Sequence, residues 1–358
     1  MKKILVIDDS ALMRRVFCDI INSEERFFVE DCATNGLEAL DLLSRKQYDA
    51  VVLDVNMPKM NGLELLKEMQ KYKISARVLM ASTDTSEGTK TTLEALELGA
   101  LDFIHKPQNA SDCRSEDFKR SFLEIVSVVS ESMPPIFTNE VQKQEERNTA
   151  VKMAEFVKRH ASLVTGKKIV AIACSTGGPK ALQSVIPLLP ASLMAPVLIV
   201  QHMPQGFTKA LADRLNTLSE LIVTEAAEGD ILENGHVYLA MGGRHMNVAN
   251  APGGKYKIHY TDEPPREGVK PCANYMFESL KVSNFDEIIC VVMTGMGADG
   301  TKGILHLKQG KSTFVIAQEQ STCAVYGMPK SIVNAGAANH IVPLDQIAQE
   351  IILSVGVK

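Results

Sequence analysis

Short apolar runs alternate with amphipathic segments along the first hundred residues of the chain. Short apolar runs are typical of buried strands, and apolar residues at a helical period are typical of helices with one buried face. The pattern predicts strands at 4–7, 28–32, 50–53, 77–81 and 101–105, with helices between them, such as 10–21 and 36–43. Such alternation requires crossovers that return the chain to a parallel sheet covered by helices on both faces.

The pattern changes after Lys106-Pro107. A helix is predicted at 116–131, and the stretch at 139–159 is rich in Gln, Glu, Lys and Asn with few apolar anchors, as in an exposed linker. A second α/β pattern follows, with predicted strands at 169–174, 197–200 and 288–293. We therefore expect a first domain at 1–107, an interdomain helix and linker at 108–166, and a second domain at 167–358.

Glycine-rich turns interrupt short strands between residues 222 and 262. The turns Glu233-Asn234-Gly235, Met241-Gly242-Gly243 and Pro252-Gly253-Gly254 separate strand-like segments at 237–239 and 257–260, which predicts hairpins inserted at a sheet edge. The expected fold class is therefore α/β with two doubly wound domains. The first has a flavodoxin-like, five-stranded parallel sheet, and the second is Rossmann-like with an antiparallel hairpin insertion.

The composition indicates the cellular compartment of the protein and excludes some classes of partner. The 358 residues carry a formal net charge of -5 without a long basic block, so binding to nucleic acid is not expected. The 7 cysteines include no Cys-x-x-Cys pair, and we expect reduced thiols in a cytoplasmic protein. The amino terminus runs directly into a strand without a signal-peptide core, and no apolar run is long enough for membrane insertion.

Three carboxylates follow predicted strands of the first domain. Asp8 and Asp9 come directly after the first strand, and Asp54 follows the third. Carboxylates gathered at one edge of a parallel sheet repel one another unless a hard cation is present, and Mg²⁺ is the natural occupant for phosphoryl chemistry. Ser82 and Lys106 follow two further strands and supply a hydroxyl and a cation for an anionic group on Asp54. Taken singly, the acids and Ser82 could instead cap helices, and Lys106 could be a solvated surface charge.

These strand ends resemble the receiver domain of two-component response regulators over residues 1 to about 107. The motifs are Asp8-Asp9-Ser10, Asp54-Val55-Asn56-Met57-Pro58, Asn61-Gly62-Leu63-Glu64 and Lys106-Pro107. The resemblance implies that a histidine kinase phosphorylates Asp54, with Asp8, Asp9 and the carbonyl of Asn56 around Mg²⁺. It also implies that Ser82 is the switch hydroxyl and that Phe103 is the aromatic residue that rotates inward on activation. The acyl phosphate would recruit Ser82 and Lys106.

Ser175 stands at a predicted strand-to-helix turn of the second domain. The apolar strand 169–174 runs into Ser175-Thr176-Gly177-Gly178-Pro179, and Pro179 suits the first turn of a helix. The turn would hold a hydroxyl at the carboxyl edge of the sheet, where ligands bind in doubly wound folds. Ser175 is therefore a candidate nucleophile, although a serine before two glycines is also typical of a helix cap or a phosphate-binding loop.

Two other strand ends offer partners for Ser175. His202 follows the strand 197–200, and Asp299 lies in the glycine-rich segment after 288–293, so a base and a carboxylate to orient it are available. Without further context, His202 could be a hydrogen-bonded loop histidine and Asp299 a helix cap. The order Ser, His, Asp and the absence of a Gly-x-Ser-x-Gly elbow separate this domain from the ordinary α/β hydrolases.

The second domain resembles the catalytic domain of the chemotaxis methylesterases of the CheB family, over residues 167 to about 355. The motifs are Ser175-Thr176-Gly177-Gly178, Gln201-His202-Met203-Pro204, Thr294-Gly295-Met296-Gly297, Asp299-Gly300 and Tyr326-Gly327-Met328-Pro329. The resemblance implies hydrolysis of glutamate γ-methyl esters on the cytoplasmic helices of chemotaxis receptors, releasing methanol, together with deamidation of receptor glutamines. It implies Ser175 as nucleophile, His202 as general base, Asp299 as its orienter and the backbone amide of Met296 as an oxyanion donor.

Together the two resemblances imply an esterase whose active-site mouth the receiver covers until Asp54 is phosphorylated. Ester hydrolysis would need no cofactor, and Mg²⁺ would serve the receiver. The implied partners are chemotaxis receptors as substrate and a histidine kinase as phosphodonor, and a monomer is expected. The rival functions are an adaptor with a degenerate esterase domain, a DNA-binding response regulator, and an esterase for another methylated signalling system. The adaptor would need a broken triad, and the DNA-binding regulator a basic recognition helix.

Overall fold

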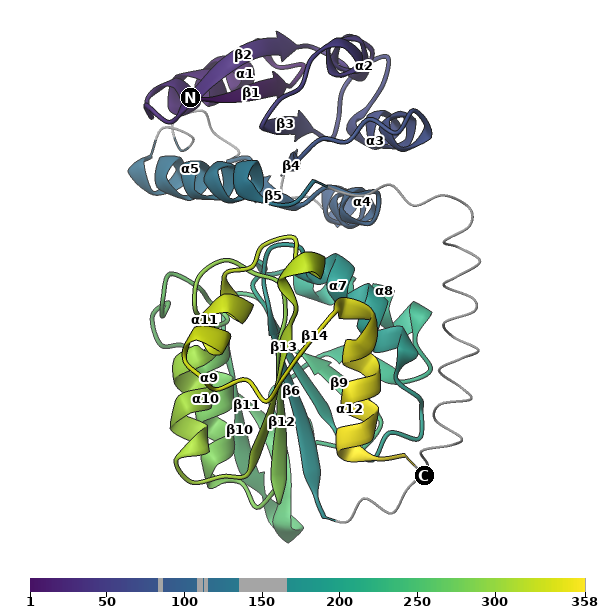
Figure 1. Ribbon diagram of the computed structural model, residues 1–358, viewed down its shortest axis with the longest axis vertical. Coiled ribbons are helices and arrows are strands. Elements are labelled where there is room, and N and C mark those ends of the chain that lie inside the picture. The colour runs from purple at the N-terminus through teal and green to yellow at the C-terminus, as the bar shows by residue number, and fades with distance from the viewer. Residues whose placement is uncertain (83–85, 108–111, 113–114, 135–165, 358) are drawn as a thin grey trace. The chain divides into compact units, whose positions relative to one another are not determined.

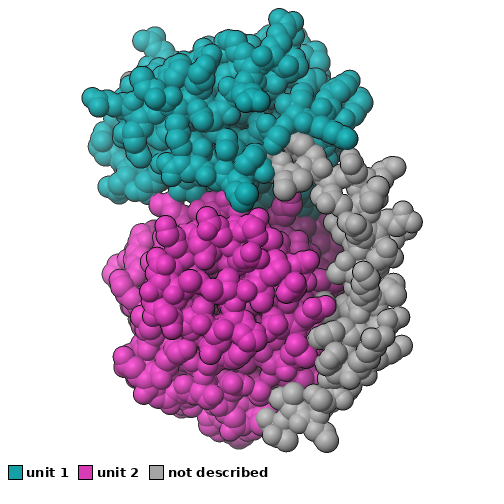
Figure 2. Space-filling view, in the orientation of Figure 1, with its two compact units in different colours: residues 1–138 teal, residues 139–358 magenta. Residues whose placement is uncertain are grey.

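The computed structural model describes residues 1–82, 86–107, 112, 115–134 and 166–357. The chain divides into two units, Met1–Thr138 and Asn139–Lys358 (Figure 2). The polar stretch at 139–159, expected as a linker, lies outside the described residues. Within the described parts of the chain, no helix is long and apolar enough to cross a membrane.

The first unit is a five-stranded parallel sheet with helices on both faces (Figure 1). Its strands, in the spatial order β2-β1-β3-β4-β5, are β1 (Lys2–Ile7), β2 (Phe27–Ala33), β3 (Ala50–Asp54), β4 (Val78–Ser82) and β5 (Asp102–His105). Its helices are α1 (Ala11–Asn22), α2 (Gly36–Arg45), α3 (Gly62–Lys71), α4 (Ser86–Glu97) and α5 (Glu116–Glu131). α1 contacts α5, whereas α3 contacts both α2 and α4, so the helices form two layers that enclose the sheet.

α5 belongs to the first unit, whereas the sequence pattern places residues 116–131 in the segment between the domains. The helix contacts β3, β4 and β5 and buries Phe122, Val126 and Val129. The ring of Phe122 stacks on Phe17 of α1 at a centroid distance of 5.0 Å. The first unit therefore continues beyond residue 107, because this amphipathic helix buries its apolar stripe against the sheet.

The second unit contains a seven-stranded sheet in which all neighbouring strands are parallel. In the spatial order β14-β13-β12-β6-β7-β9-β8, its strands are β6 (Lys168–Cys174), β7 (Val197–Gln201), β8 (Ile222–Glu225), β9 (His236–Leu239), β12 (Glu287–Val292), β13 (Thr313–Gln318) and β14 (His340–Val342). A separate antiparallel hairpin consists of β10 (His245–Ala251) and β11 (Lys255–Thr261).

Helices cover both faces of the second sheet. They are α7 (Gly178–Val185), α8 (Phe207–Leu218), α9 (Ala273–Ser279), α10 (Thr301–Lys308), α11 (Met328–Asn334) and α12 (Ile347–Val355). Short 3₁₀ helices are η2 (Ile186–Leu188), η3 (Pro252–Gly254), η4 (Leu280–Val282), η5 (Gln320–Thr322) and η6 (Leu344–Gln346). Figure 1 shows α7, α8 and α12 on one side of the sheet and α9, α10 and the hairpin on the other. Met246 and Ile258 of the hairpin share one buried cluster with Phe277 of α9 and Cys290 of β12.

One predicted hairpin is present, and the other assignment is wrong. β10 and β11 pair across the turn that contains Gly253 and Gly254, as the turn residues predict. The segment 237–239, expected as a hairpin strand, instead pairs in parallel with β7 and with β8. All three of its residues are buried, which is typical of a strand covered on both faces rather than of an exposed hairpin.

Each sheet has a point where the strand order reverses direction. In the first sheet the chain starts at β1, with β2 on one side and β3 on the other, and in the second it starts at β6, between β12 and β7. The loops that leave the carboxyl ends of these strands diverge, and this divergence opens a crevice where ligands bind in doubly wound folds. The carboxylates Asp8, Asp9 and Asp54 and the residues Ser175 and His202 follow strands at these two positions.

Candidate active site

The carboxylates expected in the first unit lie together at the reversal point of its sheet. Asp8 and Asp9 follow β1, and Asp54 ends the neighbouring strand β3. One carboxylate oxygen from each of the three residues lies within 4.8 Å of the others. Asp8 and Asp54 are buried and Asp9 is exposed, so the cluster opens to solvent on one side.

Lys106 supplies the positive charge of this cluster. Its Nζ lies 2.6 Å from Oδ2 of Asp8 and 2.5 Å from Oδ1 of Asp54, and its side chain is 8% exposed. Burial raises the pKa of Asp54 above its ordinary value, with a contribution from Asp8, whereas the ammonium of Lys106 acts in the opposite direction. The structure therefore brings Asp8, Asp9, Asp54 and Lys106 together, as the strand ends predict.

The donor set fits a magnesium ion. Mg²⁺ prefers oxygen ligands, takes one or two carboxylates and keeps room for water and phosphoryl oxygens, which matches three clustered carboxylates with one exposed side. Asn56, whose carbonyl is a further expected ligand, is exposed and follows Asp54 by two residues. Among the described residues, the cluster of Asp8, Asp9 and Asp54 is the group of acidic, histidine or cysteine side chains that could hold a metal ion.

The two switch residues occupy neighbouring strands. Ser82 ends β4 and is paired with His105 of β5, and the carbonyl of Ser82 accepts a hydrogen bond of 2.8 Å from the amide of Lys106. Phe103 is 7% exposed, and its ring contacts that of His105 edge-on at 5.8 Å between centroids. The structure therefore holds Phe103 in a buried position, and its rotation on activation stays a prediction.

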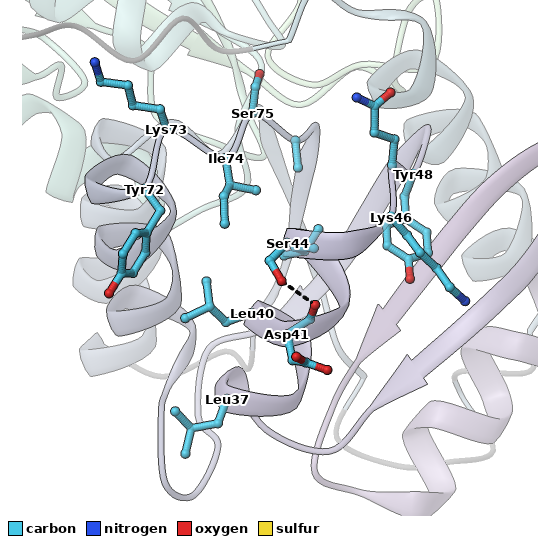
Figure 3. A pocket seen from close by; sticks show the side chains of 13 residues that line it. Leu37, Leu40, Asp41, Ser44, Lys46, Tyr48, Tyr72, Lys73, Ile74 and Ser75 are labelled. Carbon is cyan, nitrogen blue, oxygen red and sulfur yellow. Dashed lines mark hydrogen bonds between the residues drawn. The ribbon is translucent and has the colours of Figure 1, made fainter.

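A hollow of about 770 Å³ lies at the other end of the first unit (Figure 3). Tyr48 and Ala76, which precede β3 and β4, line it together with Leu37, Lys46 and Tyr72. None of the clustered carboxylates borders it. This hollow is therefore separate from the chemistry expected at Asp54.

In the second unit, Ser175 and His202 leave adjacent strands at the reversal point. Cys174 and Gln201 are paired in β6 and β7, and the amide of His202 donates to the carbonyl of Cys174 at 3.1 Å. The amide of Ser175 donates to the carbonyl of Thr294, after β12, at 3.0 Å. Three neighbouring strand ends thus converge on Ser175, as the sequence predicts for a residue at this edge.

Gly295 lets the segment after β12 approach Ser175 closely. A Cβ at this position would lie 2.8 Å from Cβ of Ser175, closer than real Cβ atoms approach, and 3.0 Å from its amide nitrogen. The amide of the next residue, Met296, makes no backbone hydrogen bond within the described parts of the chain. Gly177, two residues after Ser175 and with a φ of 77°, is the N-cap of α7, so the positive end of a helix lies next to this turn. Among the described residues, a close main-chain segment with a free amide and the amino end of a helix therefore both lie near the serine.

His202 and Asp299 form a direct pair. Nε2 of His202 lies 2.8 Å from Oδ2 of Asp299, and the two side chains are 9% and 3% exposed. Since a carboxylate only accepts hydrogen bonds, the proton of the neutral imidazole resides on Nε2, and Nδ1 keeps a lone pair. Within the described residues no hydrogen bond joins the Ser175 hydroxyl to His202, and such bonds often tighten only when substrate is bound.

The carboxylate of Asp299 is held by a ring of donors. Oδ2 also accepts from the amide of Ala273 at 2.6 Å, and Oδ1 accepts from Cys272 Sγ at 3.0 Å and from the amides of Asn274 and Gly300 at 2.9 and 2.8 Å. Burial alone would raise the pKa of Asp299, but hydrogen bonds from His202, Cys272 and Ala273 outweigh it and lower the pKa to about 2. The side chain therefore stays ionised and fixed at neutral pH.

This arrangement makes the stability of the second unit depend on pH. The pKa of Asp299 is about 2 in the folded chain against an ordinary value of 3.8, so the ionised carboxylate stabilises the fold above pH 3.8. The stabilisation is lost as pH falls through 2, and amounts to about 2 kcal/mol. Urea unfolding of the second unit followed at successive pH values checks this. Asp299→Asn should flatten the dependence between these two pKa values, and an unchanged slope would contradict it.

Several residues that support the site were not predicted as site residues. Gln201 is 2% exposed, and its Nε2 donates to the carbonyl of Ser175 at 3.0 Å and to that of His202 at 3.2 Å. Thr294 Oγ1 donates to the carbonyl of Thr176 at 2.9 Å. Gln201 precedes His202, and Thr294 lies two residues before Met296, so their place in the same motifs could have marked them as site residues. Cys272 lies in a loop that contains no predicted site residue.

Two families of known proteins match the chain, one in each of its two units. The family model of the CheB methylesterase matches residues 170–351, and that of the response regulator receiver domain matches residues 4–116. The chain belongs to the CheB methylesterase family. This CheB family membership confirms both resemblances drawn from the motifs, and the two parallel sheets confirm the α/β fold class.

Relatives of this CheB family chain align with it over nearly their whole length. The protein-glutamate methylesterase/protein-glutamine glutaminase of Geobacillus kaustophilus is 39% identical over 354 residues, or 99% of each chain. The protein of the same name from Bacillus subtilis is 40% identical over 357 residues, or 98% of each. A crystal structure of the CheB methylesterase catalytic domain of Thermotoga maritima is 40% identical, covers 53% of this chain and 98% of its own, and superposes with a TM-score of 0.50.

Proposed function

We propose that the chain is a phosphorylation-activated serine esterase that removes methyl groups from glutamate side chains of chemotaxis receptors and deamidates receptor glutamines. The observation that carries the proposal is the His202–Asp299 pair, joined at 2.8 Å on the strand end beside Ser175. The names of the full-length relatives support the substrate class. An adaptor with a degenerate esterase domain is disfavoured because all three members of the triad are present at one edge of the sheet.

The chemistry begins at the hydroxyl of Ser175. Nδ1 of His202 accepts its proton, since Nε2 donates to Asp299, and the alkoxide attacks the ester carbonyl. The imidazolium then returns the proton to the leaving methoxide, and methanol departs. Water attacks the acyl enzyme in the same way and restores the hydroxyl. A glutamine side chain follows the same steps and releases ammonia.

The oxyanion of each tetrahedral intermediate would be stabilised by main-chain amides. The amide of Met296 has no backbone partner within the described residues and follows Gly295, which lies against Ser175. The amino end of α7 follows Ser175 closely in the chain and adds positive potential. No cofactor enters this reaction.

We assign control of the esterase to Asp54. Its carboxylate is the proposed phosphoryl acceptor, and Asp8, Asp9 and the Asn56 carbonyl would hold Mg²⁺ beside it. When bound, the ion offsets carboxylate charge and orders phosphoryl oxygens. Lys106 already lies 2.5 Å from Asp54 and would pair with the new phosphoryl group. Ser82 would supply a hydroxyl from β4, and Phe103 would rotate in response.

The partners follow from this assignment. A histidine kinase would donate the phosphoryl group, and the methylated cytoplasmic helices of receptors would be the substrate, so the protein would act in the cytoplasm. We also propose that it acts as a monomer. A domain boundary within 108–166 would separate the receiver from the esterase. An esterase for another methylated signalling system would use the same chemistry. Only an assay with the two kinds of methylated substrate would distinguish it from a receptor esterase.

Methanol release from methylated receptor membranes tests the function. A small-molecule acyl phosphate with Mg²⁺ should raise the rate by about 5- to 150-fold, the usual range of coupling between two sites. Asp54→Asn should remove this stimulation, because an amide cannot form an acyl phosphate, and the exposed Asp19→Asn should not alter it. Release that is absent with receptor membranes but present with another methylated protein would redirect the proposal to a different substrate.

Gln201→Met should lower kcat about 10- to 100-fold with little change in KM, because Gln201 ties the main chain of Ser175 to that of His202. Methionine has a similar volume but donates no hydrogen bond. The rate of labelling of Ser175 by a fluorophosphonate reports nucleophile activation without receptor binding. The exposed Gln346→Met serves as control. An unchanged labelling rate in Gln201→Met would rule out the positioning role.

A further inference from the structure

Two cysteines of the first unit lie side by side on neighbouring elements. Cys18 is in α1 and Cys32 is in β2, and their sulfur atoms are 3.5 Å apart, so one thiol donates a hydrogen bond to the other. The two residues are 14 positions apart in the chain, and the packing of α1 on β2 brings them together. Neither cysteine has a part in the chemistry proposed for Asp54 or Ser175.

The pair is also reachable from solvent. Cys32 is exposed and Cys18 is partly exposed, whereas Cys174, Cys272, Cys290 and Cys323 are buried. Cys113 lies outside the described residues. Among the described cysteines, a reagent in solution therefore meets these two first.

We propose that Cys18 and Cys32 are a modification site that low-molecular-weight disulfides oxidise to an intramolecular disulfide. The thiolate of Cys32 attacks one sulfur of the small disulfide, forms a mixed disulfide and expels one small thiolate. The sulfur of Cys18 then attacks Cys32 and expels the second. One protein S–S bond forms, two small thiols take up the two protons, and the two electrons pass to the oxidant.

The geometry suits both steps. Cys32 is the more exposed sulfur and meets the oxidant first. Burial and the contact with Cys32 raise the pKa of Cys18 to about 12, so Cys18 enters the first step as a thiol and gives its proton to a base in solution when it attacks the mixed disulfide. A disulfide bond is about 2.0 Å long, so the two sulfurs, 3.5 Å apart, must close by about 1.5 Å.

The bond would restrain the helix that supports the carboxylate cluster. Arg14 lies one turn before Cys18 in α1, and its Nη1 donates to the main-chain oxygens of Asp8 at 2.8 Å and Asp9 at 3.1 Å. A bond from Cys18 to Cys32 would fasten this helix to β2. The modification site is independent of the proposed esterase function, because it rests on the two sulfurs alone.

Intact-mass measurement of the full chain tests the proposal. The reduced Cys113→Ser protein, freed of reductant and treated with glutathione disulfide, should lose about 2 Da, and dithiothreitol should restore it. Thiols that a maleimide labels under native conditions should fall from about two per chain to none. In a second variant that also carries Cys32→Ser, the loss of about 2 Da should disappear, and Cys18 should at most gain a glutathione adduct.

Peptide mapping settles which cysteines are joined. Proteolysis of the unsubstituted, oxidised chain should yield one linked pair that contains Cys18 and Cys32, so the test does not depend on the folding of any variant. Persistence of both free thiols after oxidation would overturn the proposal. So would a linked pair that involves another cysteine, a bond between two chains, or stable glutathione adducts on both residues.

Discussion

Ser175→Ala is expected to lower methyl-ester hydrolysis by on the order of 10³-fold or more. The reason is chemical, since alanine cannot form the acyl enzyme on which the other members of the site act. Residual activity would come from the oxyanion donors and from substrate binding alone. Methanol release under saturating acyl phosphate provides the measurement. The exposed Ser184→Ala, on α7 near the same turn, is the matched control and should retain full activity.

A second measurement separates lost chemistry from lost fold in Ser175→Ala. The Ser175 hydroxyl makes no hydrogen bond within the described residues, so its removal leaves no unpaired group, and the urea midpoint of the second unit should stay close to that of the parent chain. Phosphorylation of Asp54 should be unaffected. Near-normal methanol release from a folded Ser175→Ala protein would require another nucleophile and would overturn the assignment.

Strand ends were the part of both sites that the sequence could predict. Parallel strands place the residues that follow them at one edge of the sheet, so Asp8, Asp54 and Lys106 could be grouped without knowing any contact. The same rule grouped Ser175 and His202. It works because apolar strands are easy to recognise in a sequence and because the edge at which a parallel strand ends is fixed by topology.

Other features depend on contacts that no local pattern encodes. Cys272 reaches Asp299 from a loop before α9, and its amide is itself held by Nδ1 of His245 at 3.2 Å. β13 and β14 at the edge of the second sheet were not predicted. The strand β9 was read as part of a hairpin, because the turns that flank it resemble hairpin turns and only its neighbours reveal a parallel strand.

The helix α5 illustrates a third kind of difference between the sequence-based prediction and the structure. Its residues predict a helix correctly, yet the change of composition after residue 107 suggested that the domain had ended. The structure places Phe122 against Phe17 instead. Secondary structure follows from local periodicity, whereas membership of a domain depends on which apolar face is available to receive the helix.

Asp299→Asn is expected to lower kcat by on the order of 10⁴-fold, the size of effect that follows when a triad carboxylate becomes an amide. Both oxygens of Asp299 accept hydrogen bonds, Oδ2 from His202 and an amide, and Oδ1 from Cys272 and two amides. An asparagine must turn its NH₂ group toward one of these sets of donors. The histidine then loses its preferred tautomer, or the amides of α9 lose an acceptor.

Both consequences can be measured in the same protein. The exposed Asp345→Asn is the matched control and should leave kcat and stability unchanged. The urea midpoint of Asp299→Asn reports the cost to the fold, and fluorophosphonate labelling of the folded fraction reports activation of Ser175. Among the described residues, Asp299 is the hydrogen-bond partner of the His202 imidazole, so labelling should fall together with kcat. A folded Asp299→Asn protein that keeps kcat within about tenfold of the parent would show that another group orients His202.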